Sequence, residues 1–365
     1  MLRSKLILLL VLALIVSTAG CAQKKTRKSK SLNRTEGPVR GGTFRYFLME
    51  PLTLNSAHVQ ESEGIQVAKQ IYDGLVDYDP KTMKVKPAMA KSWKSNKSAT
   101  VWTFKLRKGV KFHNERECKA QDFVYSWNRI AVKETASEVA YHLAPIKGFE
   151  ACQEGTAKRL EGVKARDDYT LEVTLKYPYA EFPTILGHIV FSPVPKEEVQ
   201  KYGEKFGENP CGTGPFKFVE WMHDQRIVLK RNPDYYGHKP YLDGIVFKIF
   251  DDEQSGFSEF KAGNLDDCEI PPGQIKRAKV IYGDCALIEP ILSLYSYGFN
   301  MDADLWGNNQ NLRRALNYAL DRKSICGDLW EGAMMPAVGI LPKGIPGFQK
   351  EAILYNHNPV RQRIF

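Results

Sequence analysis

Side chains that could carry out chemistry are scattered along this 365-residue sequence. Its seven histidines lie apart, and none forms the H-E-x-x-H pattern that places two zinc ligands on one helix face. The sequence also lacks a Walker A loop and a G-x-S-x-G turn. The glycine cluster GTGPF at 212–216 holds a proline where a phosphate cradle needs a free N–H, so it predicts a tight turn. These patterns argue against an enzyme.

The acidic and cysteine patterns give no metal site. The pairs Asp251-Asp252 and Asp266-Asp267 are adjacent in sequence, and we interpret them as solvated surface. No two cysteines have C-x-x-C spacing, which argues against a zinc or thioredoxin-like site, so we expect no metal and no cofactor. Six cysteines in the body permit 15 disulfide pairings in an oxidising compartment, and Cys268 with Cys285 would close a short loop. They are Cys118, Cys152, Cys211, Cys268, Cys285 and Cys326.

Residues 1–20 have the pattern of an export signal. Arg3 and Lys5 precede an apolar run over 6–16, which is followed by the small residues of 17–20. A permanent transmembrane anchor is the alternative interpretation. As a helix this run would be only about 16 Å long, too short for a hydrocarbon core of about 30 Å.

Cys21 follows Ala19 and Gly20 and resembles the cysteine of the bacterial lipobox, which is diacylated and becomes the new N-terminus. Thr18 departs from the leucine usual at that position, and a spare cysteine at a cleavage site is the alternative. Two or three acyl chains would hold the protein on a membrane, where a single chain binds only marginally. Residues 21–40 are polar and basic and predict a flexible tether that can also lie against anionic lipid headgroups.

The position of the basic residues decides what the net charge of +10 means. Seven positive residues and one acid fall in 21–40, and the signal holds two more positive residues. The remaining body is therefore close to neutral. The charge indicates membrane attachment and argues against a nucleic-acid partner.

Beyond residue 40 the hydrophobic pattern alternates between strand and helix periods, without repeats or heptads. The mixture predicts an α/β architecture of packed layers, as two domains or one lobed unit. Helices are expected over 62–75, 120–130 and 310–320, the last with Leu312, Ala315, Leu316 and Ala319 facing inward. Strands are expected over 41–47, 100–106, 169–175, 216–221, 226–230 and 245–250.

Eight segments of the body together resemble, in family order, the family 5 extracellular solute-binding proteins, the oligopeptide-binding components of ABC importers. The segments are QIYDGLVDYD (70–79), VWTFKLRKGVKF (101–112), DFVYSWNRI (122–130), LEVTLKYPYAEF (171–182), SPVPKEEVQKYG (192–203), GTGPFKFVEW (212–221), RIVLKRNPDYYG (226–237) and LRRALNYALDRKSI (312–325). Physically, most of these motifs explain turns and core packing rather than ligand contact.

The resemblance implies a two-lobed, type II periplasmic-binding-protein-like fold with an extra domain on lobe I. Lobe I would comprise residues 41–72 and 193–292, the extra domain 73–192, and residues 293–365 would begin lobe II. Ligand would lie in a cleft between the lobes, which close around it by hinge motion. A peptide backbone would pair like an added strand, which accepts many sequences.

Ligand-binding residues are implied by position within the family motifs, with a core aromatic as the alternative at one of them, Tyr125. Gly298 stands where peptide-binding members have an acidic residue, and Ser293 where some have a disulfide cysteine, which puts peptide specificity in doubt. The implied residues are Gln60, Glu61, Ser62, Tyr125, Glu269, Ile270, Tyr297 and Gly298.

The chain ends soon after LPKGIPGF (341–348) and YNHNPV (355–360), which resemble the approach to the bulk of lobe II. We therefore expect a C-terminally shortened chain that lacks most of lobe II. An incomplete lobe exposes strand edges and apolar faces. The expectation is a destabilised chain that binds peptide weakly or not at all.

The resemblance implies a monomeric, lipid-anchored binding component of a peptide importer, exported to the outer face of the membrane. Its partners would be an oligopeptide or other small solute, a permease and ATPase subunits. One alternative within the fold is a binder of nickel complexes, other metal chelates or another small solute. A surface lipoprotein acting as an adhesin or sensor scaffold is the alternative of another class, and an extracellular enzyme is the third.

Overall fold

The computed structural model describes residues 37–289, 291–345, 347–350 and 355–362. Apart from residues 37–39, the described residues belong to one compact unit that begins at Arg40. The predicted signal and Cys21 lie outside the described residues. Within the described part, no helix combines the length and apolar character needed to cross a bilayer.

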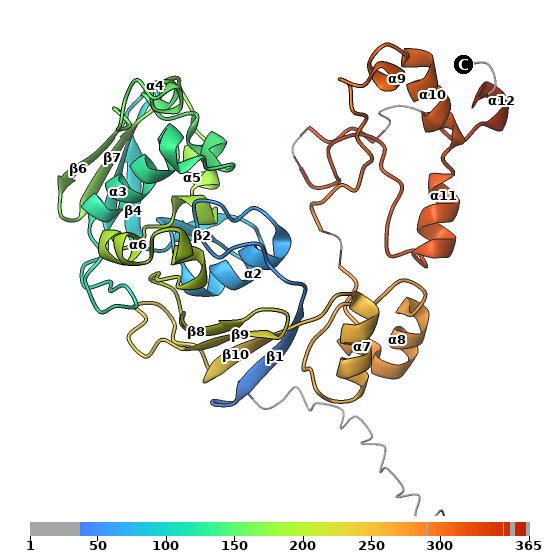
Figure 1. The fold of residues 1–365 in the computed structure, drawn as a ribbon, viewed down its shortest axis with the longest axis horizontal. Helices are drawn as coiled ribbons and strands as arrows, with labels where there is room; N and C mark the ends of the chain where they lie inside the picture. The colour runs from blue at the N-terminus through green and yellow to red at the C-terminus, as the bar shows by residue number, and fades with distance from the viewer. Residues whose placement is uncertain (1–36, 290, 346, 351–354, 363–365) are drawn as a thin grey trace, which may run out of the picture. The chain divides into compact units, whose positions relative to one another are not determined.

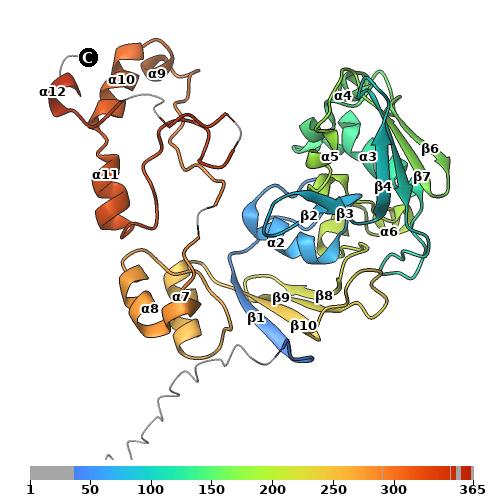
Figure 2. The same ribbon diagram turned by 180° about the vertical axis from the view of Figure 1, so that it is seen from behind.

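The first sheet joins segments that are two hundred residues apart in sequence. Its strand order is β1-β10-β9-β8, with β1 parallel to β10 and the other pairs antiparallel. The strands are β1 (Thr43–Leu48), β8 (Phe216–Met222), β9 (Arg226–Arg231) and β10 (Gly244–Ile249). Figures 1 and 2 show helix α2 (Ser62–Ile71) lying against this sheet.

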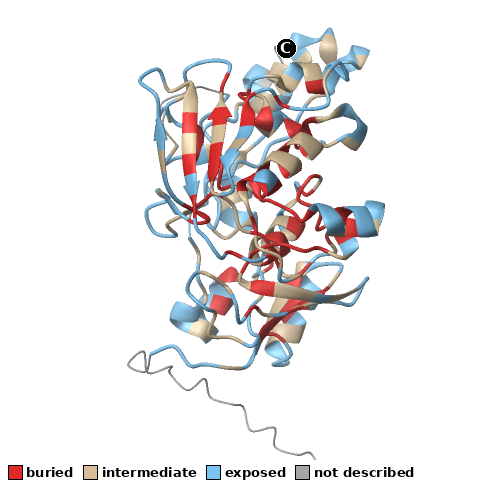
Figure 3. Ribbon diagram, turned by 90° about the vertical axis from the view of Figure 1, so that its left-hand side faces the viewer, coloured by how far each residue is buried: buried red, intermediate tan, exposed pale blue. Residues whose placement is uncertain are grey.

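A second, antiparallel sheet has the order β4-β5-β7-β6, and a hairpin pairs β2 with β3. Side chains of β5 and β7 alternate between buried and more exposed, as the banded strands in Figure 3 show. The strands are β2 (Val76–Tyr78), β3 (Val85–Pro87), β4 (Ala90–Ser95), β5 (Val101–Leu106), β6 (Val163–Asp167) and β7 (Thr170–Thr174).

Helices and short helical turns connect the strands and continue after them. The α-helices besides α2 are α3 (Ala120–Ala131), α4 (Phe149–Glu154), α5 (Phe182–Ile185), α6 (Lys196–Tyr202), α7 (Glu253–Lys261), α8 (Ile275–Tyr282), α9 (Asp304–Gly307), α10 (Gln310–Ala319), α11 (Arg322–Ser324) and α12 (Pro359–Gln362). The short turns are η1 (Lys133–Thr135), η2 (Ala140–Leu143), η3 (Ile189–Phe191), η4 (Gly203–Glu208), η5 (Gly283–Cys285) and η6 (Ile325–Leu329).

Each strand and helix expected from the hydrophobic pattern is present, with ends shifted by a few residues. The helix predicted over 62–75 ends at Ile71, because Tyr72 adopts an extended backbone. The inward face predicted for 310–320 is wrong, since no residue of α10 is buried and Leu316 is 38% exposed. The hydrophobic pattern predicted the helix correctly, but it did not predict whether another part of the chain covers the apolar side of that helix.

One continuous hydrophobic core runs through both sheets. At its centre Trp127 of α3 packs edge-on against Phe123 and Phe191, and its indole N–H donates to the Phe191 carbonyl at 2.9 Å. The first sheet falls inside the ranges predicted for lobe I and the second inside those of the extra domain. Those domain boundaries stay a prediction, because a shared core gives no seam between the two sheets.

The turn predicted at GTGPF is a place where two backbones approach closely. A side chain at Gly214 would lie 2.6 Å from the Ile71 carbonyl carbon, and the Gly214 N–H donates to the Ile71 carbonyl. His113 closes the same junction, with Nε2 3.0 Å from the Gly214 carbonyl and Nδ1 accepting from the Gly212 N–H. Burial lowers the pKa of His113 to about 4, so the ring is neutral at pH 7.

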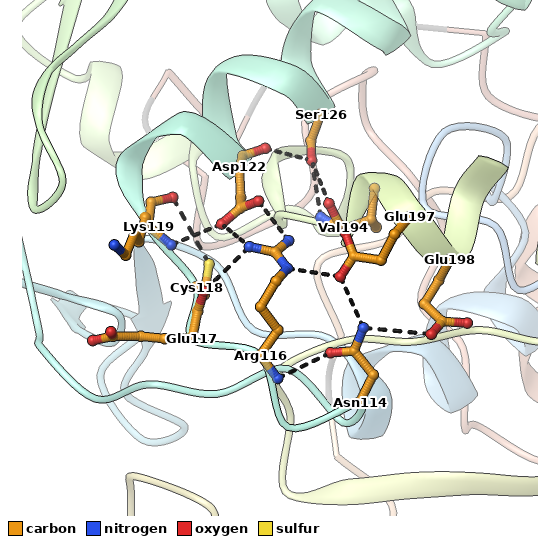
Figure 4. A network of polar contacts seen from close by, with 10 residues as sticks. All are labelled: Asn114, Arg116, Glu117, Cys118, Lys119, Asp122, Ser126, Val194, Glu197 and Glu198. Carbon is orange, nitrogen blue, oxygen red and sulfur yellow. Dashed lines mark hydrogen bonds and ion pairs between the residues drawn. The ribbon is translucent and has the colours of Figure 1, made fainter. Parts of the chain in front are cut away.

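A polar network joins the loop before α3 to the start of α6 (Figure 4). The Arg116 guanidinium donates two hydrogen bonds to Asp122, at 2.7 and 3.1 Å, and one to Glu197 at 2.7 Å. Asp122 also accepts from the Lys119 N–H at the first turn of α3. Ser126, one turn later, accepts from the Val194 N–H. The DFVYSW motif therefore serves to dock two helices.

The RNPDYYG motif is docked in the same way. The hydroxyls of Tyr235 and Tyr236 each donate to Asp73 at 2.7 Å, and the two rings lie 4.9 Å apart. Burial raises the pKa of Asp73, while the two tyrosine hydrogen bonds oppose that rise. Asp73 belongs to the QIYDGLVDYD motif, so two of the recognised segments bind each other.

The suggested disulfide between Cys268 and Cys285 is wrong. All six cysteines of the body are free thiols in the structure. Cys268 follows the residue that bridges to β1, whereas Cys285 is exposed in η5. The acidic pairs are also more than solvated surface, because Asp252 caps α7 and Asp266 pairs with Arg45 at 2.7 Å.

We predict that Asp122→Asn lowers the free energy of unfolding by about 2 to 3 kcal/mol, because it removes the buried one of the two carboxylates that Arg116 binds and leaves only Glu197. Asp168→Asn is the matched control, since Asp168 pairs with Lys119 at the surface and is 58% exposed, which gives less than about 1 kcal/mol. Urea unfolding measures both. Equal losses would contradict a structural role for the network.

The low pKa of His113 predicts an acid-sensitive fold. An unfolded histidine takes up a proton near pH 6.5 and the folded one near pH 4, so stability from this group is complete above pH 6.5 and is lost as pH falls toward 4. The loss is up to about 3 kcal/mol. His113→Gln should flatten the unfolding free energy over this range, whereas His238→Gln, at an exposed position, should leave it unchanged. An unaltered pH profile in His113→Gln would refute the assignment.

Candidate functional site

Three separate chain segments meet where the parallel strands β1 and β10 end. The chain leaves β1 at Leu48 and returns to begin α2 at Ser62, and it leaves β10 at Ile249 to begin α7. A third segment lies beside β1, because Asp267 bridges to Tyr46 in parallel and its carbonyl accepts from the Phe47 N–H. Ligands of open α/β sheets bind outside the carboxyl ends of strands, which makes this edge the candidate site.

Four carboxylates gather at this edge, from α2, α7 and the segment beside β1. They interact electrostatically, because Glu63, Glu253 and Asp267 each raise the pKa of Glu269, after the larger effect of partial burial. Partial burial also raises the pKa of Asp267. Tyr46 lies against the same group, and burial, Asp267 and Glu269 raise its pKa. The edge can therefore accept hydrogen bonds and attract a positive charge.

Residues 60–62 form the entry to α2. The Gln60 amide donates to Glu138 at 2.5 Å, while Glu61 accepts from the backbone N–H groups of Leu52 and Gln60. Glu61 thus holds its own loop in shape. Ser62 is exposed in the first turn of α2, whose backbone N–H groups have no partner within the helix. These N–H groups can donate to a carbonyl or carboxylate.

Tyr125 lies elsewhere, on α3. Its ring lies 6.0 Å from the Lys196 ammonium of α6, and burial raises the pKa of its hydroxyl. Among the described contacts of Tyr125, none connects it to Gln60 or Glu269. Its surroundings fit the core-aromatic alternative, packed between α3 and α6.

The other predicted residues differ in exposure. Glu269 joins the carboxylate group, and Ile270 follows it, partly exposed and outside regular secondary structure. Tyr297 is 78% exposed and contacts Tyr295 edge-on at 5.7 Å, and a side chain added at Gly298 would meet nothing within 4 Å. Glu63, which directly follows the predicted residues 60–62, interacts with Glu269, and no described contact extends that connection to 297–298.

Sequence reasoning missed Glu63, Glu253 and Asp267. Their neighbourhood depends on the parallel pairing of distant segments with β1, and no local sequence pattern predicts that pairing. Within the described part of the chain, no group of three or more histidine, cysteine, aspartate or glutamate side chains could hold a metal ion. Two surface hollows lie away from this edge, one lined by Arg231 and Lys239 and the other by Arg313 and Tyr355.

Comparison with known proteins gives the family of this chain. The oligopeptide-binding protein OppA of Bacillus subtilis is 32% identical over 82% of the chain. The probable deoxycholate-binding periplasmic protein YgiS of Escherichia coli is 30% identical over 86% of it. The chain spans 56% and 59% of the lengths of these two relatives.

A solved structure and a family profile agree with those relatives. The crystal structure of Haemophilus influenzae OppA in complex with the peptide RPPGFSPFR superimposes with a TM-score of 0.74 at 28% identity, covering 81% of this chain and 59% of that one. Residues 84–361 match the profile of the bacterial extracellular solute-binding proteins, family 5, middle region. With its mixed α/β sheets and helices, this chain therefore belongs to the family 5 bacterial extracellular solute-binding proteins and has their type II periplasmic-binding-protein fold.

Proposed function

We propose that this protein is the extracytoplasmic substrate-binding component of an ABC importer, which captures oligopeptides and delivers them to a membrane permease. Its role is binding rather than catalysis, and ATP hydrolysis belongs to separate subunits. The observation that carries the proposal is the edge at the end of β1, where a helix start and a group of carboxylates meet. Relatives named for oligopeptide binding support it.

A peptide offers N–H donors and a positively charged N-terminus, which complement the carboxylates of this edge. Backbone N–H groups and an N-terminal ammonium would bind to Glu269 and its neighbouring carboxylates, and peptide carbonyls would accept from the first turn of α2. Residues 268–270 follow the bridge at Asp267 without regular secondary structure of their own, so a peptide could add to them as a strand. Backbone pairing of this kind favours broad sequence tolerance.

Another small solute is the second candidate, and a specific observation favours it. A relative with 30% identity over 86% of the chain is named for deoxycholate binding, so this family's fold is connected with steroid ligands as well as peptides. Deoxycholate carries a carboxylate and lacks N–H donors. The carboxylates at the edge would repel it, and peptide is therefore the preferred ligand.

We place the protein on the outer face of the cell membrane, exported by residues 1–20 and held through a lipid on Cys21. Supporting this placement are the apolar run, the small residues before the cysteine and the basic segment after it. We also propose domain boundaries at residues 72, 192 and 292, which rest on the resemblance to the family.

We predict that a pool of three- to nine-residue peptides at millimolar concentration raises the melting temperature of the full chain by a few degrees. Millimolar peptide is used because weak binding is expected, and a ligand at ten times its Kd adds about 1.4 kcal/mol of stability. Glu269→Gln should weaken binding about tenfold, because a charge-assisted hydrogen bond is lost. Differential scanning calorimetry measures both.

The control for this experiment is Glu154→Gln, an exposed glutamate of α4, which should bind peptide like the unchanged chain. Binding should also weaken as the pH falls through the raised pKa of Glu269, because the protonated carboxyl no longer attracts N–H groups strongly. A melting shift with deoxycholate but none with peptides would replace the proposal by the second candidate.

The anchor has its own test. We expect the protein of intact cells to partition into the detergent phase of Triton X-114 and Cys21→Ser to partition into the aqueous phase, because the variant cannot be acylated. Cys285→Ser, which alters an exposed thiol of the body, is the control. Retention of Cys21→Ser in the detergent phase would indicate the transmembrane alternative.

A further inference from the structure

A basic hollow lies at the opposite end of β1 from the carboxylates. It has a volume of about 430 Å³ and lies where the chain enters β1 and β10. Arg40 and Gly41 form one wall, Arg231 at the end of β9 another, and the loop with Lys239 and Pro240 a third. Neither the predicted ligand residues nor the family motifs explain why three cations surround one hollow.

The balance of charge in the hollow is positive. Asp243 is its one acidic wall residue, and both of its oxygens are occupied, one by Arg231 at 2.9 Å and the other by the Gly42 N–H at 3.0 Å. Arg40 and Lys239 form no ion pair within the described part of the chain, and both are exposed. The hollow therefore holds two uncompensated positive charges that face solvent.

The two arginines are also held in place. The Arg40 guanidinium lies 5.0 Å over the Tyr241 ring, and Arg231 donates to the carbonyls of Pro240 and Tyr241 at 3.5 and 3.4 Å. A guanidinium group can donate two parallel hydrogen bonds to two oxygens of one phosphate, while a lysine ammonium supplies a compact positive charge. Two arginines and a lysine around one concavity therefore suit a phosphate group.

We propose that this hollow binds the phosphate headgroup of an anionic phospholipid, so that the body of the protein docks on the membrane by its β1 entry. Arg40 directly ends the basic segment 21–40, which has the same affinity for anionic surfaces. The nineteen residues from Cys21 to Arg40 can span at most about 65 Å, so an anchored protein keeps the hollow within reach of the bilayer. This orientation points the carboxylate edge away from the membrane.

The inference uses the anchoring part of the proposed function, but its test needs neither an acyl chain nor a peptide. The full chain carrying Cys21→Ser is mixed with vesicles of 30% phosphatidylglycerol in phosphatidylcholine, and with pure phosphatidylcholine vesicles. Co-sedimentation measures both apparent affinities, and the affinity for the anionic vesicles is divided by the affinity for pure phosphatidylcholine. The apolar leader contributes equally to both affinities, so its contribution drops out of this ratio. Failure here would leave peptide binding untouched, and failure of peptide binding would leave this result standing.

Two double variants remove the same charges from different places. Arg40→Gln with Lys239→Gln should lower the affinity ratio about tenfold or more, since each basic residue near an anionic surface contributes about 1 kcal/mol. Lys158→Gln with Arg159→Gln removes one exposed lysine and one exposed arginine outside the hollow, and it should change the ratio less than about twofold. Lys239→Gln alone should lower the ratio about fivefold, which separates the hollow from the basic segment.

Two outcomes would overturn the proposal. Equal losses in both double variants would mean a general attraction of charge with no site. In the second outcome, Lys239→Gln weakens the binding of inorganic phosphate but leaves the ratio of the two vesicle affinities unchanged. The hollow would then bind the free ion and not a headgroup. Unchanged melting temperatures of the variants establish that lost binding is not lost folding.

Discussion

The parallel ladder between β1 and β10 is the constraint on which the rest of the structure depends. It pairs Thr43–Leu48 with Gly244–Ile249 across two hundred residues of sequence, so closing it costs chain entropy that the contacts of the folded body must offset. Strands β9 and β8 continue the sheet beyond β10, and the segment at Asp267 lies along the other side of β1. Both ends of β1 gain their surroundings from this one pairing.

The two ends of β1 have opposite charge. Carboxylates from α2, α7 and the segment after Asp267 gather where the strand ends, and cations gather where it begins. A six-residue strand is about 20 Å long, which keeps the two groups separate beyond the screening length of physiological salt. A near-neutral body can therefore present one face suited to N–H groups and ammonium and another suited to phosphate.

The segments that resemble the family bind mostly to one another. Asp73 of one motif accepts from both tyrosines of another, and Arg116, between two motifs, joins the start of α3 to the start of α6. His113 and Gly214 close a third junction. Such residues are restricted in type because a buried polar group without its partner costs free energy. This explains how a sequence can identify the fold strongly and the ligand weakly.

Local patterns determined much of this protein. Period-two alternation located β5 and β7, and helical spacing located α3, because each of these elements buries one face in the core regardless of what lies beyond it. Glu269 could be named as a candidate through the family resemblance. The tertiary structure alone decided that Glu63, Glu253 and Asp267 are its neighbours, that Asp73 binds two distant tyrosines, and that α10 has no buried face. The physical reason is that electrostatic interaction and burial depend on distance in space, and the β1–β10 pairing brings together residues whose separation in sequence gives no local signal.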